Sequence, residues 1–198
     1  SMMERLRAMR EPLKYVQGRD ALLKFKDEMG YMGHRWLFVC SKSGCKACHD
    51  KLEESFAGSD DYRRYEIFGG ISSYGEINRM KAIVEEDNID TVVAVGGGSA
   101  VDTAKATAYY TGKHVVIIPT VAATDAPCTG LSVIYNDDHS FDKYLFYPTN
   151  PDAVLVDTTV IANAPAEFLI AGMGDALGTF FEGRASVRTE SPSLEGTG

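Results

Sequence analysis

The stretch that decides the fold is Asp90-Thr91-Val92-Val93-Ala94-Val95-Gly96-Gly97-Gly98-Ser99. A continuous apolar run, typical of a buried strand, ends here in three glycines. The residues that follow place Val101, Ala104 and Ala108 on one helical face, so that a helix can pack on a sheet. Strand, glycines and helix present free amides and a positive helix end to a phosphate. The stretch therefore predicts a phosphate or nucleotide site. A tight sheet connection is the alternative, since Val101 stands where a full G-x-G-x-x-G string ends.

Working outward, further apolar runs begin about 25–40 residues apart, which is the spacing of βαβ units. The expected strands are residues 35–40, 66–68, 91–95, 114–118 and 153–156, and the expected helices are residues 19–29, 46–56, 76–86 and 101–110. The strand runs are continuous rather than alternating, as in a parallel sheet that is covered on both faces. We therefore predict an α/β fold with a doubly wound, Rossmann-like parallel sheet.

Two segments depart from this rhythm. Residues 131–136 and 144–147 flank the polar turn 137–140, which predicts an inserted β-hairpin. After Thr158 the pattern becomes helical. We expect an N-terminal α/β domain over residues 1–157 and the beginning of an all-helical domain over residues 158–198.

Composition excludes several classes of protein. The 198 residues include 20 lysines and arginines against 28 aspartates and glutamates, so the formal net charge is −8. An acidic surface argues against nucleic-acid binding. No apolar run approaches the roughly 18 residues that span a bilayer. The first residues carry charges where a secretory signal has an apolar stretch, so we expect a cytoplasmic protein without a membrane partner.

The cysteines admit several interpretations. Cys40, Cys45 and Cys48 have the spacing C-x4-C-x2-C, and Cys128 follows far downstream, which superficially matches an iron–sulfur pattern. Residues 45–49 also form a C-x-x-C-H string, as in haem attachment, and a redox C-x-x-C pair is a third reading. We favour ordinary reduced thiols, with Cys40 buried in a strand.

Local pattern leaves two further candidates open. Asp102 and Lys105 lie three residues apart after the glycines, either as a solvated pair or as polar groups beside a cofactor. Asp125 lies in a loop of small and hydroxylic residues after an apolar strand, where ligands bind in open α/β sheets. The alternative for Asp125 is a turn acid.

With these strings in view, the chain resembles the glycerol dehydrogenase branch of the group-III, metal-containing (iron-type) alcohol dehydrogenase family. The matching strings are Gly96-Gly97-Gly98, Asp102-Thr103-Ala104-Lys105, Pro119-Thr120, Thr124-Asp125-Ala126-Pro127-Cys128, Leu131-Ser132-Val133-Ile134-Tyr135, Asn150-Pro151-Asp152 and Gly172-Met173-Gly174-Asp175-Ala176-Leu177. Their order and spacing cover roughly residues 10–190.

The resemblance implies a set of site residues. The cofactor would contact Gly97, Gly98, Ser99, Ala100, Val101, Asp102, Thr120, Val121, Ala122, Ala123, Thr129, Leu131 and Tyr135. Asp125 would contact the polyol hydroxyls, and Asp175 would be the first ligand of a catalytic divalent metal, zinc before iron. These two aspartates are the catalytic residues that the resemblance implies.

The implied reaction is the NAD-dependent oxidation of glycerol to dihydroxyacetone at a metal-activated secondary hydroxyl, by an enzyme that is a homo-oligomer at full length. Family members take two further metal ligands from later histidines, and none of the four histidines here corresponds to them. We therefore expect weak metal binding and weak turnover from these 198 residues, as part of a longer enzyme.

Ser41 and Lys42 stand where NAD-preferring members carry an acid, so NADP is the alternative cofactor. Two other functions stay open. One is a dehydroquinate-synthase-like cyclase, which would need basic residues that the loop at 124–128 lacks. The other is a non-catalytic nucleotide-binding module.

Overall fold

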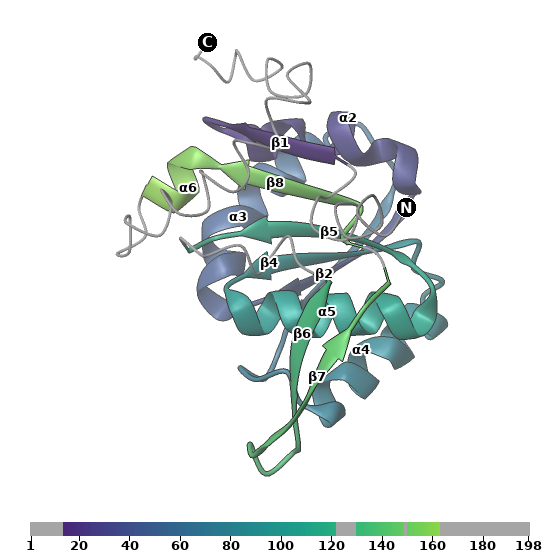
Figure 1. Cartoon of the computed structure of the whole chain (residues 1–198). Coiled ribbons are helices and arrows are strands. Elements are labelled where there is room, and N and C mark those ends of the chain that lie inside the picture. The colour runs from purple at the N-terminus through teal and green to yellow at the C-terminus, as the bar shows by residue number, and fades with distance from the viewer. Residues whose placement is uncertain (1–13, 122–129, 149, 163–198) are drawn as a thin grey trace, which may run out of the picture.

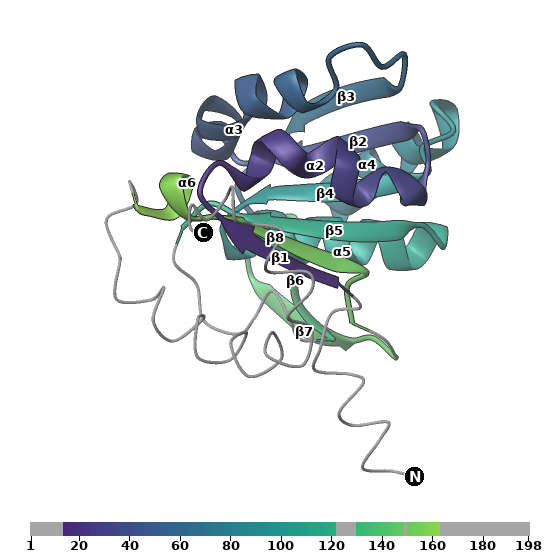
Figure 2. The ribbon, with the colours of Figure 1, turned by 90° about the horizontal axis from the view of Figure 1, so that it is seen from above.

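The computed structural model describes residues 14–121, 130–148 and 150–162. Within these ranges six parallel strands form one sheet in the order β1-β8-β5-β4-β2-β3, which can be followed in Figures 1 and 2. The strands are β1 (Lys14–Gly18), β2 (Arg35–Cys40), β3 (Tyr62–Ile67), β4 (Thr91–Gly96), β5 (His114–Pro119) and β8 (Ala153–Asp157). The predicted α/β fold with a doubly wound parallel sheet is confirmed.

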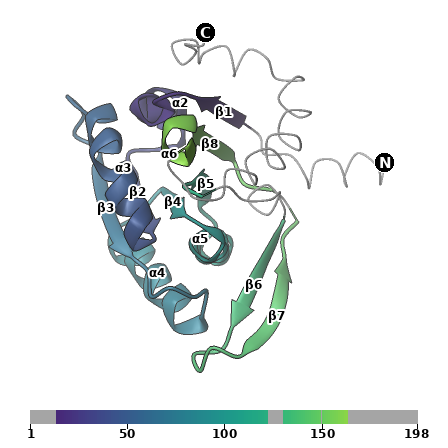
Figure 3. The same ribbon diagram turned by 90° about the vertical axis from the view of Figure 1, so that its left-hand side faces the viewer.

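Helices cover both faces of this sheet. The described helical elements are η1 (Ala21–Lys24), α2 (Phe25–Met29), η2 (Gly30–Met32), α3 (Lys42–Ser55), α4 (Tyr74–Glu86), α5 (Gly98–Thr111) and α6 (Thr158–Ala162). The helices α2 and α3 lie on one side of the sheet, and α4 and α5 lie on the other (Figure 3).

The strand β2 shows why the apolar runs are continuous. Trp36, Phe38 and Cys40 point to the side of α3, whereas Leu37 and Val39 point to the side of α5. All five side chains are buried. A strand that is buried on both faces therefore needs apolar residues at every position rather than at alternate ones.

Several element boundaries differ from the prediction. The edge strand β1 was not expected, because it buries just Tyr15 and Val16 among polar neighbours. The other edge strand, β3, begins at Tyr62 rather than at residue 66, and its charged residues obscure the pattern. The continuous helix expected over residues 19–29 is wrong. Asp20 has a left-handed φ of 55°, and short helical turns follow it.

The predicted hairpin is present as β6 (Leu131–Tyr135) and β7 (Phe141–Phe146), which pair antiparallel. Ser132 is buried and donates a hydrogen bond to the Asp102 carbonyl of α5, so that α5 lies between the sheet and the hairpin (Figure 3). The second strand begins at Phe141 rather than at residue 144.

The predicted domain boundary follows Asp157, where α6 begins. Val160 and Ile161 of α6 pack into the two cores of the α/β unit. The remainder of the expected helical domain, residues 163–198, lies outside the described residues. No helix among the described residues is long and apolar enough to cross a bilayer.

Candidate functional site

The course of the chain creates a crevice between β2 and β4. From β2 the chain runs outward through α3 to the edge strand β3, and then returns through α4 to β4 on the other side of β2. The helices that follow β2 and β4 therefore leave the sheet on opposite faces. In open α/β sheets, ligands bind at such a switch point, beyond the carboxyl ends of the strands.

A cavity of about 590 Å³ lies at this place. We call it the strand-end cavity. It is lined by residues at and beyond the carboxyl ends of three strands, namely Ser41, Lys42, Ile67, Phe68, Gly69, Gly70, Gly97, Gly98, Ser99 and Ala100. Four of the predicted cofactor residues, Gly97 to Ala100, thus lie together on one wall. The volume is within the range of small-molecule sites.

Gly97 to Ala100 form the wall that we call the glycine wall, and Gly96 shapes it. Its φ is +156°, and a Cβ here would lie 2.8 Å from Ser41 Oγ and 3.0 Å from Ala100 Cβ, so a larger residue does not fit. Gly98 begins α5, and a Cβ at this position would meet nothing within 4 Å. The amides of the first helical turn have no partner within the helix. Three of the residues that carry them, Gly98 to Ala100, line the cavity, which makes this wall suitable for an anion.

The second wall follows β2. Ser41 caps α3, because its Oγ accepts a hydrogen bond from the Gly44 amide at 2.9 Å. The Ser41 amide donates to the Val95 carbonyl at 2.9 Å and ties this wall to β4. A Cβ at Gly44 would lie 2.6 Å from the same carbonyl oxygen. The loops after β2 and β4 are therefore in direct contact, and Lys42 is exposed beside them.

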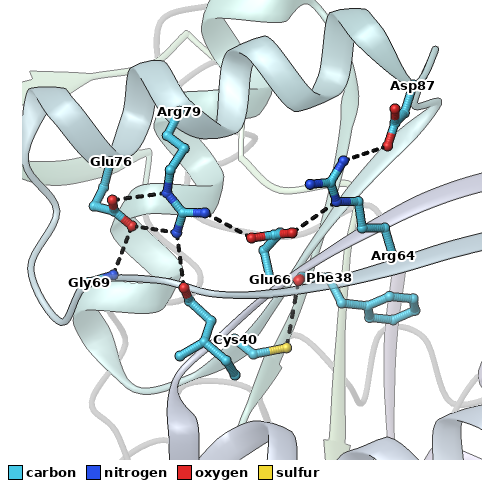
Figure 4. A network of polar contacts seen from close by, with 9 residues as sticks. Phe38, Cys40, Arg64, Glu66, Gly69, Glu76, Arg79 and Asp87 are labelled. Carbon is cyan, nitrogen blue, oxygen red and sulfur yellow. Dashed lines mark hydrogen bonds and ion pairs between the residues drawn. The ribbon is translucent and has the colours of Figure 1, made fainter.

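The third wall is the loop after β3, and a charged network holds it in place (Figure 4). The Arg79 guanidinium donates to the Ile67 carbonyl at 2.9 Å, to Glu76 at 2.9 Å and to Glu66 at 2.8 Å. Glu76 also accepts from the Gly69 amide at 2.8 Å. The hydrogen bond from Arg79 lowers the pKa of Glu76, so this carboxylate stays ionised and paired.

Other predicted cofactor residues lie outside this lining. Thr120 and Val121 follow β5, and Val121 Cγ2 is 3.3 Å from the Cβ position of Gly97, so they adjoin the glycine wall. Val101 packs into the core and offers a ligand no side chain. Leu131 and Tyr135 lie half-buried on β6.

The Asp102 carboxyl faces the hairpin, and neither Asp102 nor Lys105 is among the residues that line the strand-end cavity. Lys105 is 3% exposed, so the interpretation as a solvated pair is wrong. Ser132 Oγ donates to the Asp102 carbonyl at 3.2 Å and accepts from the Tyr147 hydroxyl at 2.7 Å. Burial raises the pKa of Asp102 to about 6, although the charge of Lys105 opposes this rise. This polar cluster attaches the hairpin to α5.

The remaining candidates cannot be placed. Ala122, Ala123, Asp125, Cys128, Thr129 and Asp175 lie outside the described residues. Within the described part of the chain, no three histidine, cysteine, aspartate or glutamate side chains gather as a metal site. Cys40 is buried in β2 as expected, and burial raises its pKa strongly. Burial also raises the pKa of Cys48 to about 12, so both are protonated, unreactive thiols at neutral pH.

The third wall was missed by the sequence analysis. A sequence pattern could have indicated this wall, because the apolar pair Ile67-Phe68 is followed by Gly69-Gly70, just as the apolar run of β4 is followed by glycines. What the sequence did not reveal was that β3 lies beside β2, with its loop facing the same cavity.

Comparison with known proteins identifies the family. The family model of iron-containing alcohol dehydrogenases matches residues 12–158. A glycerol dehydrogenase from Thermotoga maritima is 47% identical over 187 residues, and the match covers 93% of this chain and 50% of the relative. A glycerol dehydrogenase from Escherichia coli is 42% identical over 190 residues, with 96% and 52% covered. The chain thus spans about half the length of the curated relatives it matches.

Solved structures agree with these matches. A glycerol dehydrogenase from Schizosaccharomyces pombe superposes with a TM-score of 0.73 at 36% identity, over 85% of this chain and 43% of that one. A probable glycerol dehydrogenase from Sinorhizobium meliloti gives a TM-score of 0.72 at 39% identity, over 86% and 46%. On this sequence match and this fold, the chain belongs to the iron-containing alcohol dehydrogenase family.

Proposed function

We propose that this chain is the dinucleotide-binding part of a polyol dehydrogenase that oxidises glycerol to dihydroxyacetone with NAD as the cofactor. Two glycerol dehydrogenases match 96% and 93% of the chain at 42% and 47% identity, which supports the substrate class. The observation that carries the proposal is the strand-end cavity, whose glycine wall ends at the open first turn of α5.

The residues of the cavity fit a dinucleotide. The pyrophosphate would bind the first-turn amides of Gly98, Ser99 and Ala100, where the helix dipole favours negative charge. Ser41 and Lys42, at the end of the neighbouring strand, would then contact the adenosine ribose. The Ile67 and Phe68 side chains offer an apolar surface for the adenine.

The chemistry divides between cofactor and protein. When bound, the nicotinamide would supply the acceptor for the hydride of the polyol carbinol carbon, and the hydroxyl proton would be released to solvent. The chain holds and orients the two reactants. We propose Asp125 for orienting the polyol hydroxyls and Asp175 as a ligand of a divalent metal, zinc first and iron as the alternative. Both residues lie outside the described part of the chain.

Titration of the protein with NADH, followed by nicotinamide fluorescence, tests the proposal. The informative variant is Gly98→Asp. A Cβ at Gly98 meets nothing within 4 Å, and an acid in the first turn interacts favourably with the helix dipole. The variant should therefore fold normally. Two like charges about 5 Å apart repel by about 3 kcal/mol at an effective dielectric constant of about 20, so NADH binding should weaken about 100-fold.

The matched control is Ala57→Asp, which adds the same charge at an exposed position outside the cavity lining. NADH binding that is equal in the two variants would contradict the proposed site. Formation of reduced nicotinamide from NAD and glycerol then tests the reaction, and binding without turnover would indicate that this chain supplies cofactor binding alone.

A further inference from the structure

We propose that the strand-end cavity accepts a phosphate on the adenosine 2′-hydroxyl, so that the protein uses NADP(H) beside NAD(H), with Ser41 and Lys42 as the residues that determine this specificity. The inference rests on the proposed function, because it assumes that a dinucleotide occupies the cavity. It concerns one end of that cavity, which we call the Ser41 corner: Ser41, Lys42, Gly69 and Gly70.

The position of the Ser41 corner assigns it to the ribose. The strand β2 pairs directly with β4, which carries the glycine turn, and Ser41 follows the last residue of β2. In dinucleotide-binding folds, the residue at the end of this neighbouring strand contacts the ribose next to the pyrophosphate. A carboxylate there bonds the ribose hydroxyls and repels a 2′-phosphate, whereas a nearby cation attracts it.

Here the position carries no carboxylate. The hydroxyl of Ser41 accepts a hydrogen bond from the Gly44 amide, which keeps it at the start of α3. Lys42 follows with an exposed side chain that lines the cavity. Lys42 has no salt bridge to any residue in the described ranges. Its charge is therefore available to an anionic ligand.

The opposite side of the corner does not cancel this charge. Residues 67–70 are uncharged, and the carboxylates that flank this loop are Glu66 and Glu76. Both are bound to Arg79, with N–O distances of 2.8 and 2.9 Å, and Glu66 also pairs with Arg64 at 2.9 Å (Figure 4). The α5 side contributes Ser99 and Ala100, which are uncharged. Among the described residues that line the cavity, Lys42 is thus the one that carries a charge.

Parallel fluorescence titrations with NADH and NADPH test the inference. We expect NADPH to bind as tightly as NADH or to within tenfold of it. Ser41→Asp introduces a carboxylate while keeping a good N-cap, so α3 should remain intact. This variant should raise the ratio of the NADPH to the NADH dissociation constant about 100-fold. Lys42→Ala should raise the same ratio about five- to tenfold.

Two controls separate this effect from general changes in charge. Lys46→Ala removes a cation one turn further along α3, outside the cavity lining, and Ala57→Asp adds a distant acid. Both should leave the ratio of the two dissociation constants unchanged. NADPH binding more than tenfold weaker than NADH binding would overturn the inference and leave the proposed function standing. Failure of both dinucleotides to bind would overturn both.

Discussion

Replacement of the buried acid Asp61 tests how much its hydrogen bonds and ion pair contribute to the stability of the fold. Its side chain is 3% exposed and accepts hydrogen bonds from Lys26 Nζ at 2.6 Å and from Trp36 Nε1 at 2.9 Å. His34 Nδ1 lies 3.0 Å away. Burial by itself raises the pKa of Asp61, but the hydrogen bonds from Lys26, Trp36 and His34 outweigh it and hold this pKa at about 2, against an ordinary value of 3.8. The network joins α2 and β2 to the loop before β3.

The magnitude follows from linkage. At about 1.4 kcal/mol per pH unit, a pKa lowered from 3.8 to about 2 corresponds to about 2.5 kcal/mol of stability. Because the folded-state pKa is depressed, this contribution is complete well above pH 4 and is lost as the pH falls through about 2. About half of it should remain at pH 3. We therefore expect Asp61→Asn to unfold with a free energy about 2–2.5 kcal/mol lower than the wild type at pH 7.

Urea unfolding at pH 7 and pH 3 provides the assay, followed by far-ultraviolet circular dichroism and by the emission of Trp36, the one tryptophan of the chain. The difference in free energy of unfolding between the wild type and Asp61→Asn should be about half as large at pH 3 as at pH 7. Asp60→Asn, an exposed neighbour, is the matched control and should change stability by less than about 0.5 kcal/mol. Equal midpoints for Asp61→Asn and the wild type at pH 7 would refute the reasoning.

Three further outcomes are expected. Gly44→Ala should cost about 2 kcal/mol or more in calorimetric unfolding and weaken NADH binding, because its Cβ would lie 2.6 Å from the Val95 carbonyl oxygen. Because burial raises the pKa of Asp102, the wild type should lose stability as the pH rises from about 4 through about 6. Asp102→Asn should abolish this loss. Urea unfolding at pH 4 and pH 7 measures the loss in free energy of unfolding, which should be about 1–3 kcal/mol in the wild type. Phe25→Ala should cost about 3–5 kcal/mol by urea unfolding, whereas Tyr31→Ala, at a side chain 67% exposed, should cost less than about 1 kcal/mol.

The central strands were predictable from the sequence, and the edges were not. The bounds of β2 agree with the prediction residue for residue, since burial on both faces demands an uninterrupted apolar run. An edge strand has fewer buried positions, as the burial of β1 and β3 shows. The break at Asp20 depends on a distant partner, because the amides of Asp20 and Leu22 both donate to the Asp157 carboxylate. A contact that spans most of the chain leaves no local pattern.

The candidate site, like the fold, could be predicted from the sequence in part. The glycine wall could be predicted because strand, glycines and helix follow one another within a short stretch of chain. Joining it to Ser41 and to residues 67–70 required the strand order, which brings the ends of β2, β3 and β4 together. The resemblance predicts that Asp102 lies near the cofactor, and the structure adds that its carboxyl group lies on the side of α5 that carries the hairpin, where burial raises its pKa. Residue type alone does not show which face of a helix meets which neighbour.

If the Ser41 corner holds the adenosine ribose, as proposed, the two roles of Ser41 would allow cofactor specificity to change without a loss of stability. Its side chain caps α3, and its Oγ lies so close to the backbone at Gly96 that a Cβ there would be 2.8 Å away. An aspartate caps a helix as well as a serine does, so either residue satisfies the same amide. The two differ in the charge that they present to the ribose, not in the hydrogen bond that they offer to Gly44. Helix capping therefore does not distinguish the two residues, and at the proposed site they would differ in their preference for a 2′-hydroxyl or a 2′-phosphate.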